Sequence, residues 1–185
     1  HETMKLRILN GGHAVIAYPG GLLGHQHVHE AMADPRILAF LDRIEQQEII
    51  PRVPPVPGVD LHAYYTSIRE RFANPRIGDT VRRLCLDGSN RQPKFIVPVI
   101  RDAIADGGPL DGLALESALW CRYCAGRTDA GAVIEANDPN WSDLQARAEA
   151  ARERPAAWLE QLAIYGEAGA DQRFADRFGH WLDRL

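Results

Sequence analysis

Lysine is rare in this sequence, and one of its two lysines begins a spaced set of polar residues. Of the 21 basic residues only Lys5 and Lys94 are lysines, and the others are arginines. Lysine can give up its proton when it is desolvated, whereas arginine stays protonated in proteins, so a general base or proton shuttle requires lysine. Asn10 and His13 follow Lys5 along the chain. Lys5 is therefore a candidate base, although a lysine on a solvated helix face is the ordinary alternative.

Asn10 and His13 would add an amide and an imidazole to the same site. On an α-helix, which turns about 100° per residue, Asn10 lies about 140° and His13 about 80° from Lys5, so the three side chains can face one cleft. Gly11 and Gly12 weaken such a helix by about 1 kcal/mol each relative to alanine, a cost that is understandable if a ligand or another helix approaches the backbone there. The spacing alone is also compatible with ordinary polar positions.

A second candidate set surrounds a predicted turn at Asp87-Gly88-Ser89. Ser89 is predicted to cap the helix that follows. Arg83 and Arg91 lie on either side of this turn, where their guanidinium groups can donate hydrogen bonds to a polyhydroxylated ligand. A structural turn with surface arginines fits the same residues, and the sequence leaves both interpretations open.

Two further pairs have the spacing of metal or redox sites. His25 and His29 stand four residues apart, as in a helical metal pair. They have no third ligand nearby, so packing or capping is favoured and no metal is expected. Cys121 and Cys124 have the spacing of a redox or zinc pair but lie in the apolar middle of a predicted helix without a second pair. This position favours buried thiols.

The hydrophobic pattern is helical nearly throughout, because apolar residues recur at spacings of three and four and no convincing alternating strand appears. Asp or Asn followed by Pro marks helix starts at Asp34, Asn74 and Asp138. The predicted helices cover 35–49, 61–73, 75–86, 89–106 and 113–124, with two or three more in 139–185, broken at Pro155 and Gly166. A proline-rich connector separates the first two at 51–58. The sequence predicts an all-α domain with 113–124, the most apolar helix, at its centre.

Composition limits the classes of function. The chain is 45% apolar and 25% charged, as in soluble globular proteins, and no apolar run could span a bilayer. The net charge of -4 offers no basic stripe for nucleic acid, so a small-molecule ligand is expected. Three cysteines and no secretory signal suit the cytoplasm. The first residues already have the pattern of a helix interior, so we expect a fragment of a longer protein. No glycine-rich turn between a strand and a helix is visible, so no dinucleotide-binding fingerprint is present.

Several different motifs occur together in the chain, as far as about Ala125. They are Lys-x4-Asn-x2-His at Lys5, Asn10 and His13, followed by Val28-His-Glu-Ala-Met32, Glu48-Ile-Ile-Pro51, Arg71-Phe-Ala-Asn-Pro75 and Asp87-Gly-Ser89. This combination resembles the mannitol dehydrogenase family of long-chain, metal-independent polyol dehydrogenases, and it is far more specific than any one of the motifs.

The resemblance implies a helical C-terminal domain over 1–185, of the kind seen in 6-phosphogluconate dehydrogenase-like enzymes. It also implies an N-terminal Rossmann domain, absent from this chain, that binds NAD. Lys5 would be the general base, Asn10 would donate to the developing alkoxide or carbonyl oxygen, and His13 would orient a neighbouring hydroxyl. Arg83 and Arg91 would hold the far hydroxyls of the substrate. Arg91 stands where the family often has lysine.

The motifs at 28–32 and 71–75 look more like those of mannitol or arabinitol enzymes than those of uronate reductases. We therefore expect interconversion of D-mannitol and D-fructose with NAD, and no activity from this chain alone. Another sugar alcohol, such as arabinitol or sorbitol, or a hexuronate is the alternative within the class. A helical interaction module without chemistry of its own is the alternative of another class, and it would make Lys5, Asn10 and His13 dispensable.

Overall fold

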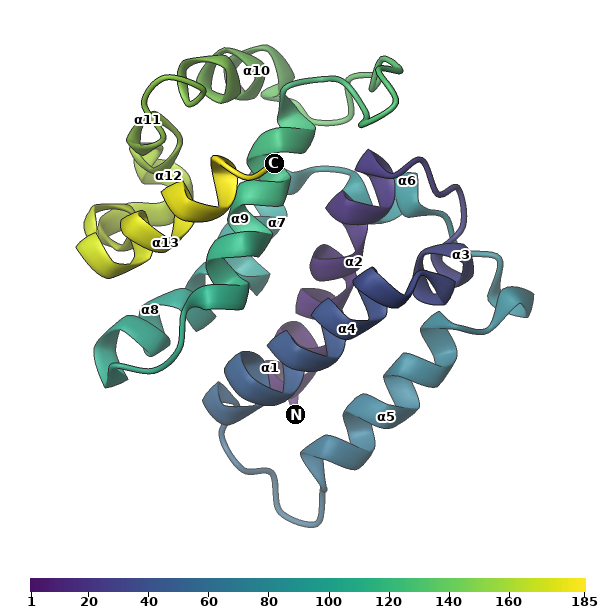
Figure 1. Cartoon of the computed structure of the whole chain (residues 1–185). Coiled ribbons are helices and arrows are strands. Elements are labelled where there is room, and N and C mark those ends of the chain that lie inside the picture. The colour runs from purple at the N-terminus through teal and green to yellow at the C-terminus, as the bar shows by residue number, and fades with distance from the viewer.

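The computed structural model describes residues 1–185, and every regular element in it is a helix. The only β-type pairings are two isolated bridges, His27 with Thr80 and Arg127 with Val133. The predicted all-α class is confirmed. Figure 1 shows the helices gathered around α2 and α9, with α5 on one flank and α10 to α13 on the other.

The chain begins with one long helix in three parts, α1 (Glu2–Met4), η1 (Lys5–Asn10) and α2 (Gly11–Leu22). The middle part, η1, is π-helical, so its hydrogen bonds join residue i to residue i+5 and not to i+4. Most of α2 is buried, and it packs against α6 and α9. The segment that carries the candidate residues therefore runs directly into the core.

The next elements are α3 (Val28–Ala33) and α4 (Pro35–Ile44), which meet at Asp34. The Asp34 carboxylate accepts a hydrogen bond from the Arg36 backbone at 3.0 Å, so the predicted cap is confirmed. α4 continues into a second π-helical turn, η2 (Glu45–Ile49), as far as the predicted end at Ile49, and then into a short 3-10 turn, η3 (Ile50–Arg52). The connector leads to α5 (Leu61–Phe72), which Asp60 caps.

The helix predicted over 75–86 is wrong, because the chain forms two short elements there. A 3-10 turn, η4 (Pro75–Ile77), ends at Gly78, whose φ of 67° only glycine adopts easily. The chain then starts again at Thr80, whose side chain accepts a hydrogen bond from the Arg83 backbone and caps α6 (Val81–Cys85).

The single helix predicted from Ser89 to Asp106 is also divided, into α7 (Gly88–Phe95) and α8 (Val97–Asp106). Pro98, near the start of α8, has no backbone N–H to donate to the carbonyl oxygen of Lys94, and in a continuous helix its ring would clash with that carbonyl, so the helix breaks at Ile96 and restarts. The prediction that Ser89 caps α7 is wrong. Ser89 lies inside the helix, and its hydroxyl donates to the carboxylate of Asp138 at 2.7 Å.

The C-terminal third consists of α9 (Asp111–Cys124), α10 (Trp141–Ala150), α11 (Ala156–Leu159), α12 (Leu162–Tyr165), η5 (Gly166–Ala170) and α13 (Gln172–Leu182). The predicted breaks at Pro155 and Gly166 are confirmed. The start predicted at Asp138 is not, because α10 begins at Trp141 and the Asp138 carboxylate is engaged with Ser89. α13 lies along α9, and α9 is central as predicted (Figure 1).

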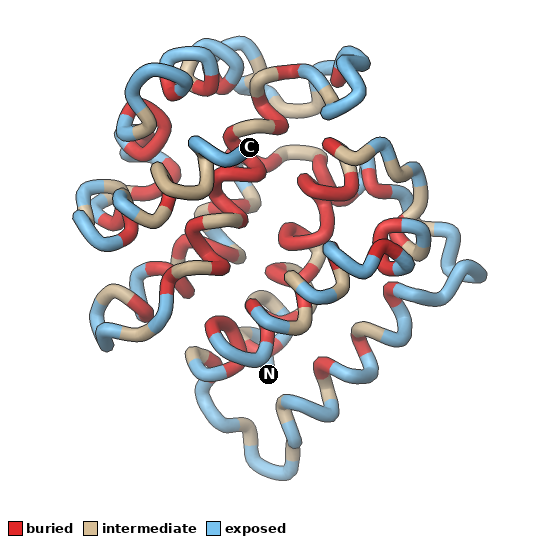
Figure 2. The backbone as a smooth tube through the Cα atoms, in the orientation of Figure 1, coloured by how far each residue is buried: buried red, intermediate tan, exposed pale blue.

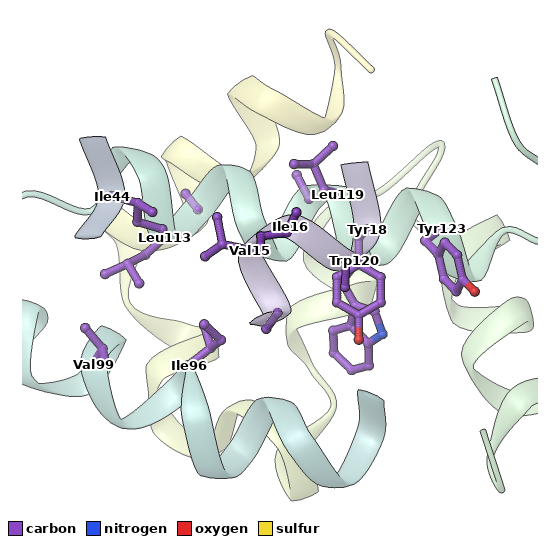
Figure 3. Packing of buried hydrophobic residues seen from close by; sticks show 14 of the residues in the cluster. Val15, Ile16, Tyr18, Ile44, Ile96, Val99, Leu113, Leu119, Trp120 and Tyr123 are labelled. Atoms are coloured by element: carbon purple, nitrogen blue, oxygen red, sulfur yellow. The ribbon is translucent and has the colours of Figure 1, made fainter. Parts of the chain in front are cut away.

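The buried side chains form one hydrophobic cluster of 48 residues, so the chain folds around a single core. Figure 2 shows the burial concentrated on α2 and α9, whereas α5 exposes most of its length. Figure 3 shows how Val15 and Ile16 of α2 meet Leu113 and Leu119 of α9 in this core. Cys85, Cys121 and Cys124 are buried free thiols, which confirms the interpretation of the cysteine pair.

The start of α9 is fixed by a carboxylate from another element. Both oxygens of Glu48, on η2, accept backbone hydrogen bonds, one from Gly112 at 2.8 Å and one from Leu113 at 3.0 Å. The first N–H groups of a helix have no partner within it, so this side chain satisfies two of them. η2 and the central helix are therefore joined by a buried polar contact. None of the helices is long and apolar enough to cross a membrane.

Candidate active site

A cavity of about 200 Å³ is lined by residues of η1, α2, α6 and α7. Its walls include four of the five residues singled out in the sequence, namely Asn10, His13, Arg83 and Arg91, together with Tyr18 and Phe95. Two sequence segments separated by about seventy residues thus meet at one site. The fold brings together an amide, an imidazole and two guanidinium groups.

Lys5 does not line this cavity. It is exposed and is the first residue of η1, whereas Asn10 is the last. Because a π-helix joins residues five apart, Lys5 and Asn10 lie closer to one face than the angle of about 140° expected for an α-helix. The two side chains are thus placed on one edge of the helix, with Asn10 in the cavity wall and Lys5 beyond it.

His13 is held flat against an aromatic ring and is kept neutral. Its imidazole stacks on Phe72 of α5, with the ring centroids 4.7 Å apart. Burial, and next the positive charge of Arg83, lower the pKa of His13 to about 4. Smaller effects of Arg91 and Arg71 act in the same direction, and only Asp79 opposes them. A neutral imidazole offers one donor and one acceptor, which suits a hydroxyl group that both donates and accepts.

The two arginines of the cavity are oriented by different partners. Arg83 forms a two-point contact with Asp79, with its Nε 2.6 Å from Oδ1, and it lowers the pKa of that carboxyl. Arg91 donates from Nη1 to the backbone carbonyl oxygen of Arg83 at 3.2 Å. This bond joins α7 to α6. Neither contact uses all five N–H groups of a guanidinium, so donors remain for a ligand.

A second hollow, of about 180 Å³, lies on the other side of His13 and Arg83. Its walls include Arg71, Phe72 and Asp79, none of which was predicted as a site residue. The sequence contained a signal for Asp79, which stands four residues before Arg83, the spacing of an ion pair on one helical turn. Arg71 and Phe72 belong to the Arg-Phe-Ala-Asn-Pro motif, although no role was assigned to them.

The histidine pair does not have the geometry that its spacing suggested. His25 lies before α3, outside any helix, and its Nε2 is 3.3 Å from the Asp34 carboxylate. His29 lies on α3 and stacks on His27, with the ring centroids 5.4 Å apart. Throughout the chain, no group of three or more His, Cys, Asp or Glu side chains is arranged to hold a metal ion.

The residues of this chain do not fit a dinucleotide site of the Rossmann type. Such a site needs a glycine-rich turn between a strand and a helix, so that backbone N–H groups can face the pyrophosphate. The chain has no strand, and its glycine-rich segment at 20–24 is the end of α2 and the turn after it. What the site offers instead is a set of hydrogen-bond donors and a nearby amine, suited to a ligand with several hydroxyls.

Comparisons with known proteins show the family of the chain. The sequence matches the family profile of the mannitol dehydrogenase C-terminal domain over residues 1–185. It is 57% identical over its whole length to mannitol 2-dehydrogenase of Cereibacter sphaeroides, and spans 39% of that protein. It is 40% identical to mannitol 2-dehydrogenase of Aspergillus niger, again over its whole length and 38% of that protein.

Solved structures give the same result. The ternary complex of Pseudomonas fluorescens mannitol 2-dehydrogenase with NAD and D-mannitol matches the whole chain with a TM-score of 0.95 and 34% identity, over 38% of its own length. A D-sorbitol dehydrogenase in its substrate-free form matches 98% of the chain with a TM-score of 0.88 and 27% identity, over 37% of its length. The family profile matches every residue, relatives of high identity carry the same name, and the solved structures share the fold. The chain therefore belongs to the mannitol dehydrogenase C-terminal domain family.

Proposed function

We propose that residues 1–185 are the substrate-binding and catalytic domain of an NAD-dependent polyol dehydrogenase that interconverts D-mannitol and D-fructose. The observation that carries this proposal is the cavity in which Asn10, His13, Arg83 and Arg91 converge beside the helix of Lys5. Its support from relatives is the mannitol 2-dehydrogenase activity named for proteins of 57% and 40% identity.

In this proposal each residue acts on one part of the polyol. Lys5 removes the proton of the hydroxyl that is oxidised. NAD, held mainly by another domain, would supply the hydride acceptor. Asn10 donates a hydrogen bond to the oxygen on which negative charge develops. His13, held neutral, both donates to and accepts from a neighbouring hydroxyl. Arg83 and Arg91 hold the hydroxyls farther along the chain, in orientations that their contacts with Asp79 and the α6 backbone fix in advance.

We propose further that NAD is bound mainly by a Rossmann domain elsewhere in a longer protein. This rests on the chain spanning 39% of the Cereibacter sphaeroides relative and on the absence of a strand-to-helix turn here. The polyol would then lie between the two domains, where Lys5, exposed in this chain, would be covered. The proposed enzyme uses no metal and acts in the cytoplasm on a small-molecule substrate.

The test is to replace Lys5 in the longer enzyme. General-base catalysis is typically worth about 10²- to 10⁴-fold, so we expect Lys5→Ala to lower the kcat of mannitol oxidation at least about a hundredfold. Lys5→Arg keeps the charge but should not restore the rate, whereas small primary amines should partly rescue Lys5→Ala. Lys94→Ala, at the only other lysine, is the matched control and should behave like the wild type.

Measured pH profiles of turnover decide the role of Lys5. A Lys5→Arg enzyme with near-normal rates and the same alkaline rise would show that Lys5 only positions the substrate and that the base lies elsewhere. Substrate choice is tested on the same enzyme with D-mannitol, D-sorbitol, D-arabinitol and a hexuronate, and we expect the highest kcat/KM for D-mannitol. If Lys5, Asn10 and His13 all proved dispensable, the domain would be a non-catalytic interaction module.

A further inference from the structure

The short helix α7 has one face that lines the cavity and another that is buried. Arg91 and Phe95, one helical turn apart, line the cavity described above. Gly88 and Gln92, also one turn apart, are buried on the side that meets α9. A Cβ atom on Gly88 would lie 2.6 Å from Nε1 of Trp120, so the backbone of α7 is pressed against the central helix at that point. The position of Arg91 in the cavity therefore depends on how the buried face of α7 packs against α9.

Behind α7 stands a buried carboxyl group that pairs with no cation. Glu116 of α9 is 1% exposed and forms no ion pair. Its Oε1 accepts a hydrogen bond from Nε2 of Gln92. An ionised carboxylate buried without a cation is costly, and proteins avoid the cost by keeping the group protonated.

The unpaired atoms of this contact point to the missing proton. Oε2 of Glu116 and Oε1 of Gln92 are both buried and both lack a hydrogen-bond partner. Two acceptors cannot satisfy each other, but a carboxylic acid O–H would donate to the amide carbonyl oxygen while the amide N–H donates in return. One proton on Glu116 thus supplies the donor that the pair lacks.

We propose that Glu116 is a neutral carboxylic acid that exchanges two hydrogen bonds with the Gln92 amide, and that this pair is the device that positions α7 and its Arg91 in the cavity. Gln92 directly follows Arg91, so a displacement of Gln92 is transmitted to Arg91 through one peptide unit. Glu116 touches no ligand and is a positioning residue. The role of Arg91 in substrate binding rests on the proposed function, whereas the acid–amide pair does not.

The groups that surround Glu116 favour its neutral form. Burial raises the pKa of Glu116 to about 8, and the hydrogen bond from Gln92 acts in the opposite direction. Tyr18 on α2 and Tyr165 on α12 face the same region, and burial raises the pKa of both phenols well above the ordinary value. Cys121, farther along α9, is a buried thiol whose pKa burial also raises. The pair should hold at neutral pH and open in alkali.

The direct test is carbon-13 NMR of the side-chain carboxyl groups of the 185-residue chain as pH is raised. We expect one glutamate carboxyl, absent from the Glu116→Gln spectrum, to titrate near pH 8. Gln92→Leu removes the donor that stabilises the carboxylate and should move this midpoint upward, which provides a second variant if Glu116→Gln does not fold. A Glu116 carboxyl that titrates near the ordinary value of 4.5 would overturn the proposal.

The positioning role has its own measurement. Backbone amide signals of α7, including that of Arg91, should shift with the same midpoint in the wild type and stay constant in Glu116→Gln, where an amide replaces the neutral acid. Glu70→Gln, at an exposed glutamate of α5, should leave the transition unchanged. If the amide signals of α7 do not shift when Glu116 ionises, the pair does not position α7 and the proposal is wrong.

In the longer enzyme the same transition should appear in KM and not in kcat. Loss of one arginine hydrogen bond predicts a rise of at least about threefold in the KM for mannitol above pH 8 in the wild type, and none in Glu116→Gln. If α7 shifts while KM stays flat, the substrate-binding role of Arg91 is refuted while the acid–amide pair stands. The proposed function and the acid–amide pair can therefore be refuted independently of each other.

Discussion

The neutral His13 of the cavity leads to a prediction about how the chain responds to acid. Burial and Arg83 lower the pKa of His13 from 6.5 to about 4. Each pKa unit corresponds to about 1.4 kcal/mol, so the whole shift is worth about 3 kcal/mol. In the unfolded chain His13 binds its proton at the ordinary value of 6.5. Between pH 6.5 and pH 4 the unfolded state therefore holds one proton more than the folded state, and lowering pH through this window should destabilise the fold by about 3 kcal/mol.

The perturbation that tests this reasoning is Arg83→Gln. It removes the largest charge that lowers the pKa of His13, and it frees the Asp79 carboxylate, which raises that pKa. The midpoint of His13 should therefore move up from about 4 toward 6.5. The neighbouring Arg82→Gln is the matched control, because Arg82 points away to the carbonyl oxygens of Glu135 and Ala136.

NMR titration of the imidazole signals is the assay, and His13→Gln identifies the signal of interest among the seven histidines. The acid-induced loss of stability should shrink in Arg83→Gln by the same amount as its midpoint rises, as measured by chemical denaturation at pH 6.5 and pH 4.5. A wild-type His13 that titrates near 6.5, or an Arg83→Gln midpoint equal to that of Arg82→Gln, would refute the argument.

Three further outcomes are expected. Glu48→Gln replaces one of the two oxygens that accept N–H groups at the start of α9, so it should lower the free energy of unfolding by about 1 to 3 kcal/mol, and an unchanged thermal midpoint would contradict the capping role. Gly88→Ala should cost about 1 to 3 kcal/mol in denaturant titrations, because its methyl group would lie 2.6 Å from Trp120 Nε1 and 2.8 Å from Tyr18 Oη. Its control, Gly179→Ala in α13, meets only Pro155 at 3.9 Å and should be neutral or stabilising by up to about 1 kcal/mol. Strong chelators should leave the rate of the longer enzyme unchanged, and a loss restored by zinc would show that a metal takes part.

Much of the helical framework can be predicted from local signals. The helix that ends at Ile49 has an Asp-Pro start and a clear apolar stripe, and both its bounds were predicted. The failure at 75–86 came from following the apolar period across Gly78 and Thr80, two residues that break a helix and start a new one. The role of Ser89 was beyond local reasoning, because its partner Asp138 lies 49 residues away.

The candidate site shows the same limit. The residue types and the turn that joins Arg83 to Arg91 were visible in the sequence, and the structure places both arginines in the cavity wall. The angle between Lys5 and Asn10 was not predictable, because local periodicity cannot distinguish a π-helical turn from an α-helical one. The packing of η1 against η2, α5 and α7 accompanies the π-helical turn, and those contacts come from residues far along the chain.

The π-helical turn also determines how many residues can separate Lys5 and Asn10 when both lie on one face of the helix. A turn of π-helix holds more residues than a turn of α-helix, so one residue can be lost there without breaking the helix. Such a deletion shortens the helix by only about 1.5 Å and leaves an α-helical turn, in which residues four apart lie on one face, as residues five apart do in the π-helical turn. The core formed by α2 would stay in place, and Lys5, then four residues before Asn10, would keep its face of the helix. When relatives are aligned, a one-residue gap within Leu6–Leu9 therefore keeps the proposed base on the same face, whereas the same gap within α2 would rotate everything before it by about 100°.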